Sequence, residues 1–147
     1  MRIAIASDHR GFALKEELKI KLQEQGQEII DCGAFNDAPS DHMDYAFKLG
    51  DKILKKEADY GVAICGTGIG MSIALNKMRG IYCAKVSSVS EATLAKAHND
   101  ANAIAISEEM DKELMKEVIK TFIETPFTNI DRYKVRNEKI KEVENNV

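Results

Sequence analysis

The chain has 147 residues, the length of one ordinary domain, which is enough to bury a core without disulfides or metal. Charged residues make up 31% of it, and the formal net charge is only -3, with acidic and basic residues mixed along the chain. This balance argues against a protein that binds nucleic acid or a membrane surface by electrostatics. No apolar run suits a signal peptide or a membrane span, so we expect one domain, residues 1–147, in the cytoplasm.

The cysteines Cys32, Cys65 and Cys83 are odd in number and widely spaced. They form no C-x-x-C pair, and no histidine stands at metal-ligand spacing from them. We therefore predict neither a disulfide framework nor a metal site.

Short apolar runs alternate with longer amphipathic runs, a pattern typical of strands alternating with helices. In chain order, we predict a strand at 2–7, a helix at 12–25, a strand at 28–33, a helix at 44–56, a strand at 60–66, a helix at 71–78, a strand at 81–86, a helix at 90–98, a strand at 102–107 and a helix at 108–124. The strands are nearly continuous apolar runs, as expected when helices cover both faces of a parallel sheet. This indicates an α/β fold, a Rossmann-like three-layer αβα sandwich with a five-stranded parallel sheet. The charged segment 131–146 predicts an added C-terminal helix, packed lightly on the domain or on a partner subunit.

The turn after the first strand contains three ionisable residues in a row, Asp8, His9 and Arg10. Ligands of open α/β sheets bind beyond the carboxyl ends of the strands, so such a run predicts a functional role. The alternative is structural, with Asp8 capping the helix that begins near Gly11.

The turn after the third strand is rich in glycine and reads Cys65-Gly66-Thr67-Gly68-Ile69-Gly70. Its glycines let the backbone approach a ligand, and the free N–H groups at the start of the next helix favour an anion. A dinucleotide-binding loop is disfavoured, because Met71 replaces the third glycine of G-x-G-x-x-G and no acidic residue follows near Val86. A P-loop is disfavoured because no Gly-Lys-Ser/Thr follows.

Cys65 lies at a strand end beside a helix N-terminus, where the helix dipole favours the thiolate. It could therefore serve as a base or a nucleophile. The alternative is that Cys65, like Cys83, is a small buried apolar residue, but the adjoining glycine loop favours the functional interpretation. We assign Cys32 to the buried, structural class.

A further polar group, His98-Asn99-Asp100, precedes the fifth strand. A histidine at a helix C-terminus is stabilised in its protonated form and could act as an acid, although a C-terminal cap explains it equally well. Arg132 and Arg136 are four residues apart and share one helix face. They could clamp a phosphate, although a solvated basic stripe also explains them.

Together these motifs resemble the ribose-5-phosphate isomerase B family, which also includes galactose-6-phosphate isomerase subunits, over essentially the whole chain. The resemblance rests on SDHRGFALK at 7–15, DCG at 31–33, CGTGIGMSIALNK at 65–77, AHNDANAIA at 97–105 and the arginines at 132 and 136. It implies an aldose–ketose isomerase that interconverts ribose 5-phosphate and ribulose 5-phosphate through an enediolate, without a cofactor or metal.

The resemblance also implies roles for the matching residues. Cys65 would shuttle the proton between the first two carbons of the sugar, assisted by Thr67. His98 would open the sugar ring as the acid, with Asp8 as its counterpart on the ring oxygens. Backbone amides of the glycine loop, helped by Asn99, would stabilise the enediolate oxygen. The implied substrate-binding residues are Asp8, His9, Gly66, Thr67, Gly68, Ile69, Gly70, Asn99, Arg132 and Arg136, of which His9 and the two arginines would hold the phosphate.

Departures from the family's pattern leave the substrate open. Many relatives have Tyr-Pro after the aspartate that matches Asp41, where this chain has His42-Met43, and an arginine in place of Tyr82. Glu109 replaces another phosphate-binding arginine, and one charged hydrogen bond contributes about 1.5 to 3 kcal/mol. The alternatives are the same chemistry on allose 6-phosphate, galactose 6-phosphate or a tetrose phosphate. A non-catalytic phosphosugar or nucleotide-binding module and a nicotinamide-dependent dehydrogenase fit the motifs less well.

Cys65 ends a predicted strand, whereas His98 precedes one, so we expect them at opposite edges of the sheet, about 17 Å apart. If both act on one substrate, His98 comes from a second subunit. The resemblance implies the same arrangement, a homodimer with sites shared at its interface, possibly paired into a tetramer.

Overall fold

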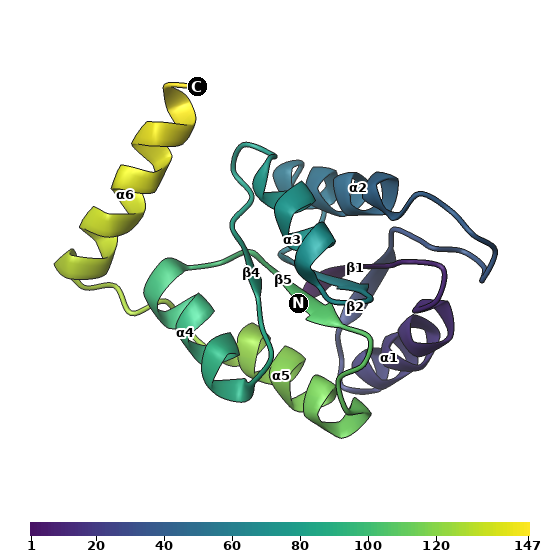
Figure 1. Ribbon diagram of the computed structural model, residues 1–147. Helices are drawn as coiled ribbons and strands as arrows, with labels where there is room; N and C mark the ends of the chain where they lie inside the picture. The colour runs from purple at the N-terminus through teal and green to yellow at the C-terminus, as the bar shows by residue number, and fades with distance from the viewer.

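The computed structural model describes residues 1–147 and has five strands that alternate with helices (Figure 1). Their bounds, in chain order, are β1 (Arg2–Ser7), α1 (Phe12–Glu24), β2 (Glu28–Asp31), α2 (His42–Leu54), β3 (Tyr60–Cys65), α3 (Ile69–Asn76), β4 (Cys83–Lys85), α4 (Val89–Asn99), β5 (Ala103–Ser107), α5 (Lys112–Glu124) and α6 (Asp131–Asn145). None of the helices is both long enough and apolar enough to cross a membrane.

The sheet has the strand order β2-β1-β3-β5-β4, and every neighbouring pair is parallel. One face is covered by α1, α4 and α5, whose buried side chains join a core cluster around Ile5, Ile64 and Phe122. The other face is covered by α2 and α3, around Leu49 and Leu75. The predicted α/β sandwich with a five-stranded parallel sheet and an added C-terminal helix is confirmed.

For α2 and α5, a carboxylate cap explains why the helix begins at a position other than the one predicted. α2 begins at His42, because the Asp41 side chain accepts the N–H of Met43 at 3.1 Å. α5 begins at Lys112 rather than at residue 108, because Asp111 accepts the N–H of Leu114 at 3.1 Å. Residues 108–110 are therefore a turn at the carboxyl end of β5 and not part of a helix.

The strand order determines where a ligand can bind. The connection after β1 leads to α1 on one face of the sheet, and the connection after β3 leads to α3 on the other face. The connection after β5 returns to the first face through α5. Ligands of such sheets bind where neighbouring connections diverge, at the carboxyl ends of the strands. Here that point lies beyond the ends of β1, β3 and β5.

Helix α6 lies beside the rest of the fold rather than within it (Figure 1). None of its residues is buried. The Glu144 carboxylate accepts hydrogen bonds from the Gly80 N–H at 2.6 Å and from the Tyr82 hydroxyl at 2.7 Å. The prediction of a lightly packed terminal helix is therefore confirmed.

Candidate active site

The turn after β1 is held against the end of β3. The N–H of Asp8 donates to the carbonyl of Ile64 at 3.0 Å, and its carboxylate accepts the N–H of Gly11 at 2.7 Å. Asp8 is buried, and the Nδ1 atom of the neighbouring His9 is buried without a hydrogen-bond partner. α1 itself begins without a side-chain cap, so the carboxylate of Asp8 braces the turn rather than capping the helix.

The glycine loop brings the Cys65 thiol together with backbone N–H groups. Cys65 is buried, and its Sγ accepts the N–H of Gly68 at 3.2 Å. Gly68 has a φ of 81°, and a Cβ on it would lie 3.1 Å from the carbonyl carbon of Ile106, so a residue with a side chain would be strained there. Thr67 is exposed, and its Oγ1 accepts the N–H of Ile69, the first residue of α3. α3 therefore begins two residues before the position predicted.

The end of β5 supports the same loop from the other side. The Ser107 hydroxyl donates to the carbonyl of Gly66 at 2.8 Å, and the N–H of Glu108 donates to the carbonyl of Cys65 at 2.9 Å. The Glu108 side chain is mostly buried beside Asp8. The sequence analysis did not identify Glu108 as a site residue, because it predicted that Glu108 belongs to the helix at 108–124. Its place directly after a predicted strand was the signal that could have identified it.

A buried lysine fixes the position of the β1 turn. Lys15 is fully buried, and its Nζ donates to both carboxylate oxygens of Asp31, at 2.7 and 2.6 Å. Asp31 in turn accepts the N–H of Gly33, whose carbonyl accepts the N–H of Ser7. Burial would raise the pKa of Asp31, but hydrogen bonds from Lys15, Lys19 and Gly33 outweigh it and lower the pKa. This network connects α1 and β2 to the residue before Asp8.

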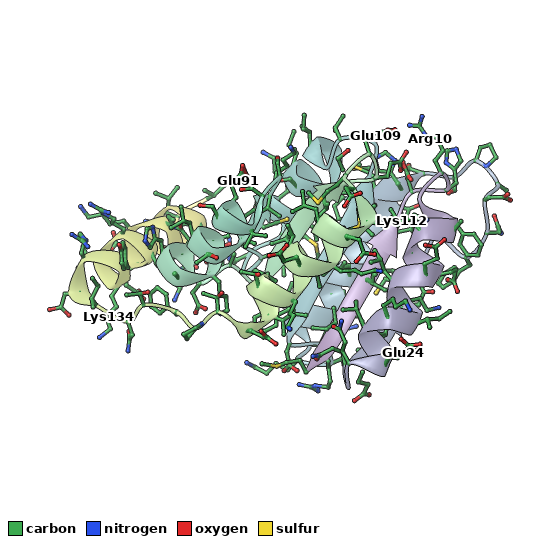
Figure 2. All side chains as sticks on the ribbon, turned by 90° about the horizontal axis from the view of Figure 1, so that it is seen from below. Arg10, Glu24, Glu91, Glu109, Lys112 and Lys134 are labelled. Carbon is green, nitrogen blue, oxygen red and sulfur yellow. The ribbon has the colours of Figure 1, made fainter.

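A second group of predicted site residues lies on α4 and α6. The His98 ring, in the last turn of α4, stacks on the Tyr133 ring of α6 with centroids 4.3 Å apart. Asn99 donates to Asn137, and Arg132 and Arg136 are exposed on α6. Figure 2 shows Lys134 of α6 and Arg10 of the β1 turn at opposite ends of the molecule.

The predicted site residues therefore fall into two groups within one chain. The carboxyl-edge group follows β1 and β3, and the amino-edge group belongs to α6 and to the helix before β5. The carboxyl-edge group consists of Asp8, His9, Cys65, Gly66, Thr67, Gly68, Ile69 and Gly70. The amino-edge group consists of His98, Asn99, Arg132 and Arg136.

The other cysteines differ from Cys65 in their surroundings. Cys32 is buried, and burial, followed by the charge of Asp31, raises the pKa of its thiol to about 11. Burial raises the pKa of the Cys83 thiol to about 12, although that residue keeps partial exposure. No group of three or more His, Cys, Asp or Glu side chains is placed to hold a metal ion.

The structure shows the surroundings of the residues that depart from the family's sequence pattern, namely His42, Met43, Tyr82 and Glu109. A Cβ on Gly70 would lie 3.5 Å from His42 Nε2 and from Met43 Cε, so both side chains border the glycine loop. Tyr82 fastens α6 through Glu144, and burial, followed by that carboxylate, raises the pKa of its hydroxyl to about 12. Glu109 is exposed and lies at the same end of the molecule as Arg10 (Figure 2).

Comparison with known proteins shows to which enzyme family the chain belongs. A family model described as Ribose/Galactose Isomerase matches residues 3–140. The chain belongs to this family. It is a sugar-phosphate isomerase, as the resemblance of its motifs implied.

Two curated members of the ribose/galactose isomerase family span nearly the whole chain. A Bacillus subtilis protein provisionally named a sugar phosphate isomerase is 40% identical over 146 residues, covering 98% of this chain and 97% of its own. Ribose-5-phosphate isomerase B of Escherichia coli is 36% identical over 144 residues, covering 97% of this chain and 96% of its own.

A solved structure of the family agrees in fold. Ribose-5-phosphate isomerase B of Mycoplasma genitalium, determined with bound ribulose-5-phosphate, superposes with a TM-score of 0.93 at 34% identity. The match covers 99% of this chain and 97% of the Mycoplasma chain. The bound ribulose-5-phosphate belongs to that relative.

Proposed function

We propose that this isomerase is a cytoplasmic, cofactor-independent enzyme that interconverts D-ribose 5-phosphate and D-ribulose 5-phosphate through an enediolate. The observation that carries the proposal is the Cys65 thiol, buried at the end of β3 with its Sγ 3.2 Å from the Gly68 amide. A thiolate there can take the proton from C2 of the open-chain aldose and return it to C1. The hydroxyl proton of O2 moves to O1 in the same conversion, so aldehyde becomes alcohol and alcohol becomes ketone.

The glycine loop would supply the electrostatic part of the reaction. Its backbone N–H groups lie at the start of α3, where the helix dipole favours the negative charge that develops on the enediolate oxygen. Gly68 is confined to its conformation by the backbone of Ile106, so these donors need no rearrangement during the reaction. Thr67, exposed at the mouth of the loop, would assist the substrate beside Cys65.

The remaining roles need a second copy of the chain. We propose a homodimer in which the amino-edge group of one subunit completes the carboxyl-edge group of its partner. His98 would open the sugar ring as the acid, with Asp8 facing the ring oxygens and Asn99 supporting the enediolate oxygen. His9, Arg132 and Arg136 would hold the phosphate. The separation of the two groups within one chain supports this arrangement, and dimers could pair further into tetramers.

A second set of substrates follows from two features of the site. Glu109 places an exposed carboxylate at the same end of the molecule as Arg10, and His42 and Met43 border the glycine loop. These side chains favour a sugar phosphate that differs from ribose 5-phosphate in length or hydroxyl configuration. The candidates are allose 6-phosphate, galactose 6-phosphate and a tetrose phosphate.

The experiment is a panel of phosphorylated aldoses, each assayed for ketose formation by the wild-type protein and by Cys65→Ala. Ribose 5-phosphate should give the highest kcat/KM, and Cys65→Ala should convert none of the panel. If another aldose phosphate is converted at least ten times more efficiently, the assignment to ribose 5-phosphate is wrong and the proposed chemistry stands. If the Cys65→Ala protein converts the panel as well as the wild type does, the role of Cys65 is wrong.

A further inference from the structure

Two carboxyl-bearing residues flank the last residues of β3. The N–H of Asp8 donates to the carbonyl of Ile64 at 3.0 Å, and the N–H of Glu108 donates to the carbonyl of Cys65 at 2.9 Å. Asp8 and Glu108 therefore approach the strand that carries Cys65 from its two neighbours, β1 and β5. Because backbone hydrogen bonds hold both residues, their main chains cannot separate without loosening the end of a strand, and only their side chains are free to turn.

The two carboxyl groups face the same small space. A Cβ on Gly11 would lie 3.2 Å from Asp8 Oδ1 and 3.3 Å from Glu108 Oε2, and only a glycine leaves that space open. Asp8 is 4% exposed and the Glu108 side chain 13% exposed, so little water reaches either group. Two carboxylates so placed are not both ionised readily, because each charge disfavours the other.

The Glu108 Oε2 atom is buried and has no hydrogen-bond partner. A buried polar atom left unpaired is costly, and a proton on Glu108 removes this cost by making the carboxyl a donor to Asp8. Asp8 keeps its other interaction, since its Oδ1 accepts the N–H of Gly11 at 2.7 Å.

The surrounding charges act in both directions on Glu108. Burial, followed by the neighbouring Asp8 carboxyl, raises the pKa of Glu108 to about 7, and the charge of Glu109 adds to this. Arg10 opposes it, with its Nε 3.8 Å from Glu108 Oε1, but the Arg10 side chain is 69% exposed and its charge is screened. The result is a carboxyl that changes its charge near neutral pH.

We propose that Glu108 is a positioning residue that retains a proton and donates it in a hydrogen bond to Asp8, so that the pair carries one negative charge beside Cys65. The inference rests on the proposed function, in which Asp8 faces the ring oxygens of the sugar. A singly charged pair holds the Asp8 carboxylate in one orientation, ready to accept a sugar hydroxyl. Loss of the Glu108 proton makes the pair doubly charged, drives the carboxylates apart and misplaces Asp8.

The first experiment compares pH profiles of kcat/KM for wild type and Glu108→Gln, using the best substrate of the panel. Glutamine keeps an N–H donor toward Asp8 but cannot lose a proton in this range. Every other titrating group is common to both proteins, so the ratio of kcat/KM in Glu108→Gln to that in wild type isolates Glu108. This ratio should be constant below neutral pH and should rise about tenfold per pH unit above it. A ratio that stays constant from pH 6 to 9 overturns the proposal.

Two further variants separate this effect from general damage. Glu113→Gln removes a carboxylate of α5 whose side chain is 81% exposed, and it should reproduce the wild-type profile. Arg10→Gln removes the cation that lowers the pKa of Glu108, so the alkaline fall in kcat/KM should move to higher pH. Because the Arg10 side chain is 69% exposed, the substitution should leave the fold intact. If the pH at which kcat/KM falls does not move in Arg10→Gln, the proposal is contradicted.

A measurement that needs no turnover distinguishes failure of this inference from failure of the proposed function. Infrared difference spectra between wild type and Glu108→Gln should show one protonated carboxyl at pH 6 that disappears as the pH rises through about 7. If no sugar phosphate is converted but this band titrates, the proposed function is wrong and the shared proton stands. If the enzyme is active but the band is missing at pH 6, the shared proton is wrong.

Discussion

The imidazole ring of His98 stacks on the phenol ring of Tyr133, with centroids 4.3 Å apart and planes inclined by 19°. This contact joins the end of α4 to α6, and Asn137 strengthens it by donating to the carbonyl of His98 at 3.0 Å. The helix that carries Arg132 and Arg136 is thereby held to the histidine proposed as the ring-opening acid. The amino-edge group is one structural unit, which a partner subunit could receive as a whole.

Cys65→Ala should abolish turnover while leaving substrate affinity nearly unchanged, because a base that acts in proton transfer contributes little to ground-state binding. Cys65→Ser should keep only weak activity. Steady-state kinetics and calorimetric titration with the product would measure the two effects separately. Cys32→Ala and Cys83→Ala are the matched controls and should leave turnover nearly unchanged. Retention of more than a few per cent of the wild-type rate in Cys65→Ala would show that the base is another group.

Gly68→Ala should both destabilise the protein and inactivate it. The left-handed φ of 81° alone costs a residue with a side chain about 1 to 2 kcal/mol, and a Cβ 3.1 Å from the backbone of Ile106 adds to this. Gly26→Ala is the matched control, since Gly26 has a φ of 87° but nothing lies within 4 Å of its Cβ. Urea unfolding should therefore show the larger loss for Gly68→Ala, and only that variant should lose activity. Equal losses in the two variants would mean that the loop accommodates a side chain.

Lys15→Met should lower the free energy of unfolding by about 3 kcal/mol at neutral pH. It removes both hydrogen bonds from Lys15 to the Asp31 carboxylate and leaves Lys19 as the cation that contacts it. Lys21→Met, at an exposed position of the same helix, should change it little. The pKa of Asp31 is lower in the folded protein than in the unfolded chain, where it is about 4. The ionised Asp31 carboxylate therefore stabilises the fold fully above about pH 4, and this stabilisation is lost as the pH falls through the pKa of Asp31 in the folded protein. The stability of Lys15→Met should therefore depend less on pH between 7 and 3 than that of the wild type. The same acid dependence in both proteins would refute the role assigned to Lys15.

The alternation of elements and the carboxyl-edge group could be predicted from the sequence, because both depend on short segments. An apolar run followed by a turn places Asp8 and Cys65 at strand ends whatever the strand order. The order itself depends on the pairing of β3 with β5, which involves residues some forty positions apart. The pairing of Asp8 with Glu108 was missed for the same reason, since only that order places the two strand ends on either side of β3.

Arg132→Ala and Arg136→Ala should each raise the KM for the phosphorylated substrate, and inorganic phosphate should compete weakly with it. Each arginine lost removes a charged hydrogen bond, which contributes about 1.5 to 3 kcal/mol, so KM should rise at least tenfold. Glu109→Arg should tighten binding of phosphate, because it replaces an exposed carboxylate by a cation. Phosphate affinity that stays unchanged or falls in Glu109→Arg would show that Glu109 is not near the phosphate.

Mixed dimers test whether the two groups meet across an interface. Cys65 ends β3 at the carboxyl edge of the sheet, whereas His98 lies in the turn of α4 that leads into β5 at the amino edge. The five residues of β5 separate these edges by about 17 Å, too far for both side chains to reach one small sugar phosphate within a subunit. Cys65→Ala and His98→Ala should each be inactive alone. When they are co-expressed in equal amounts, half of the dimers should be mixed, and each mixed dimer has one site with both defects and one with none. About a quarter of all sites should therefore recover full turnover.

Differently tagged subunits allow the mixed dimers to be isolated and assayed directly. Isolated mixed dimers that remain inactive would mean that each site is built from one subunit, and the role proposed for His98 would then be wrong.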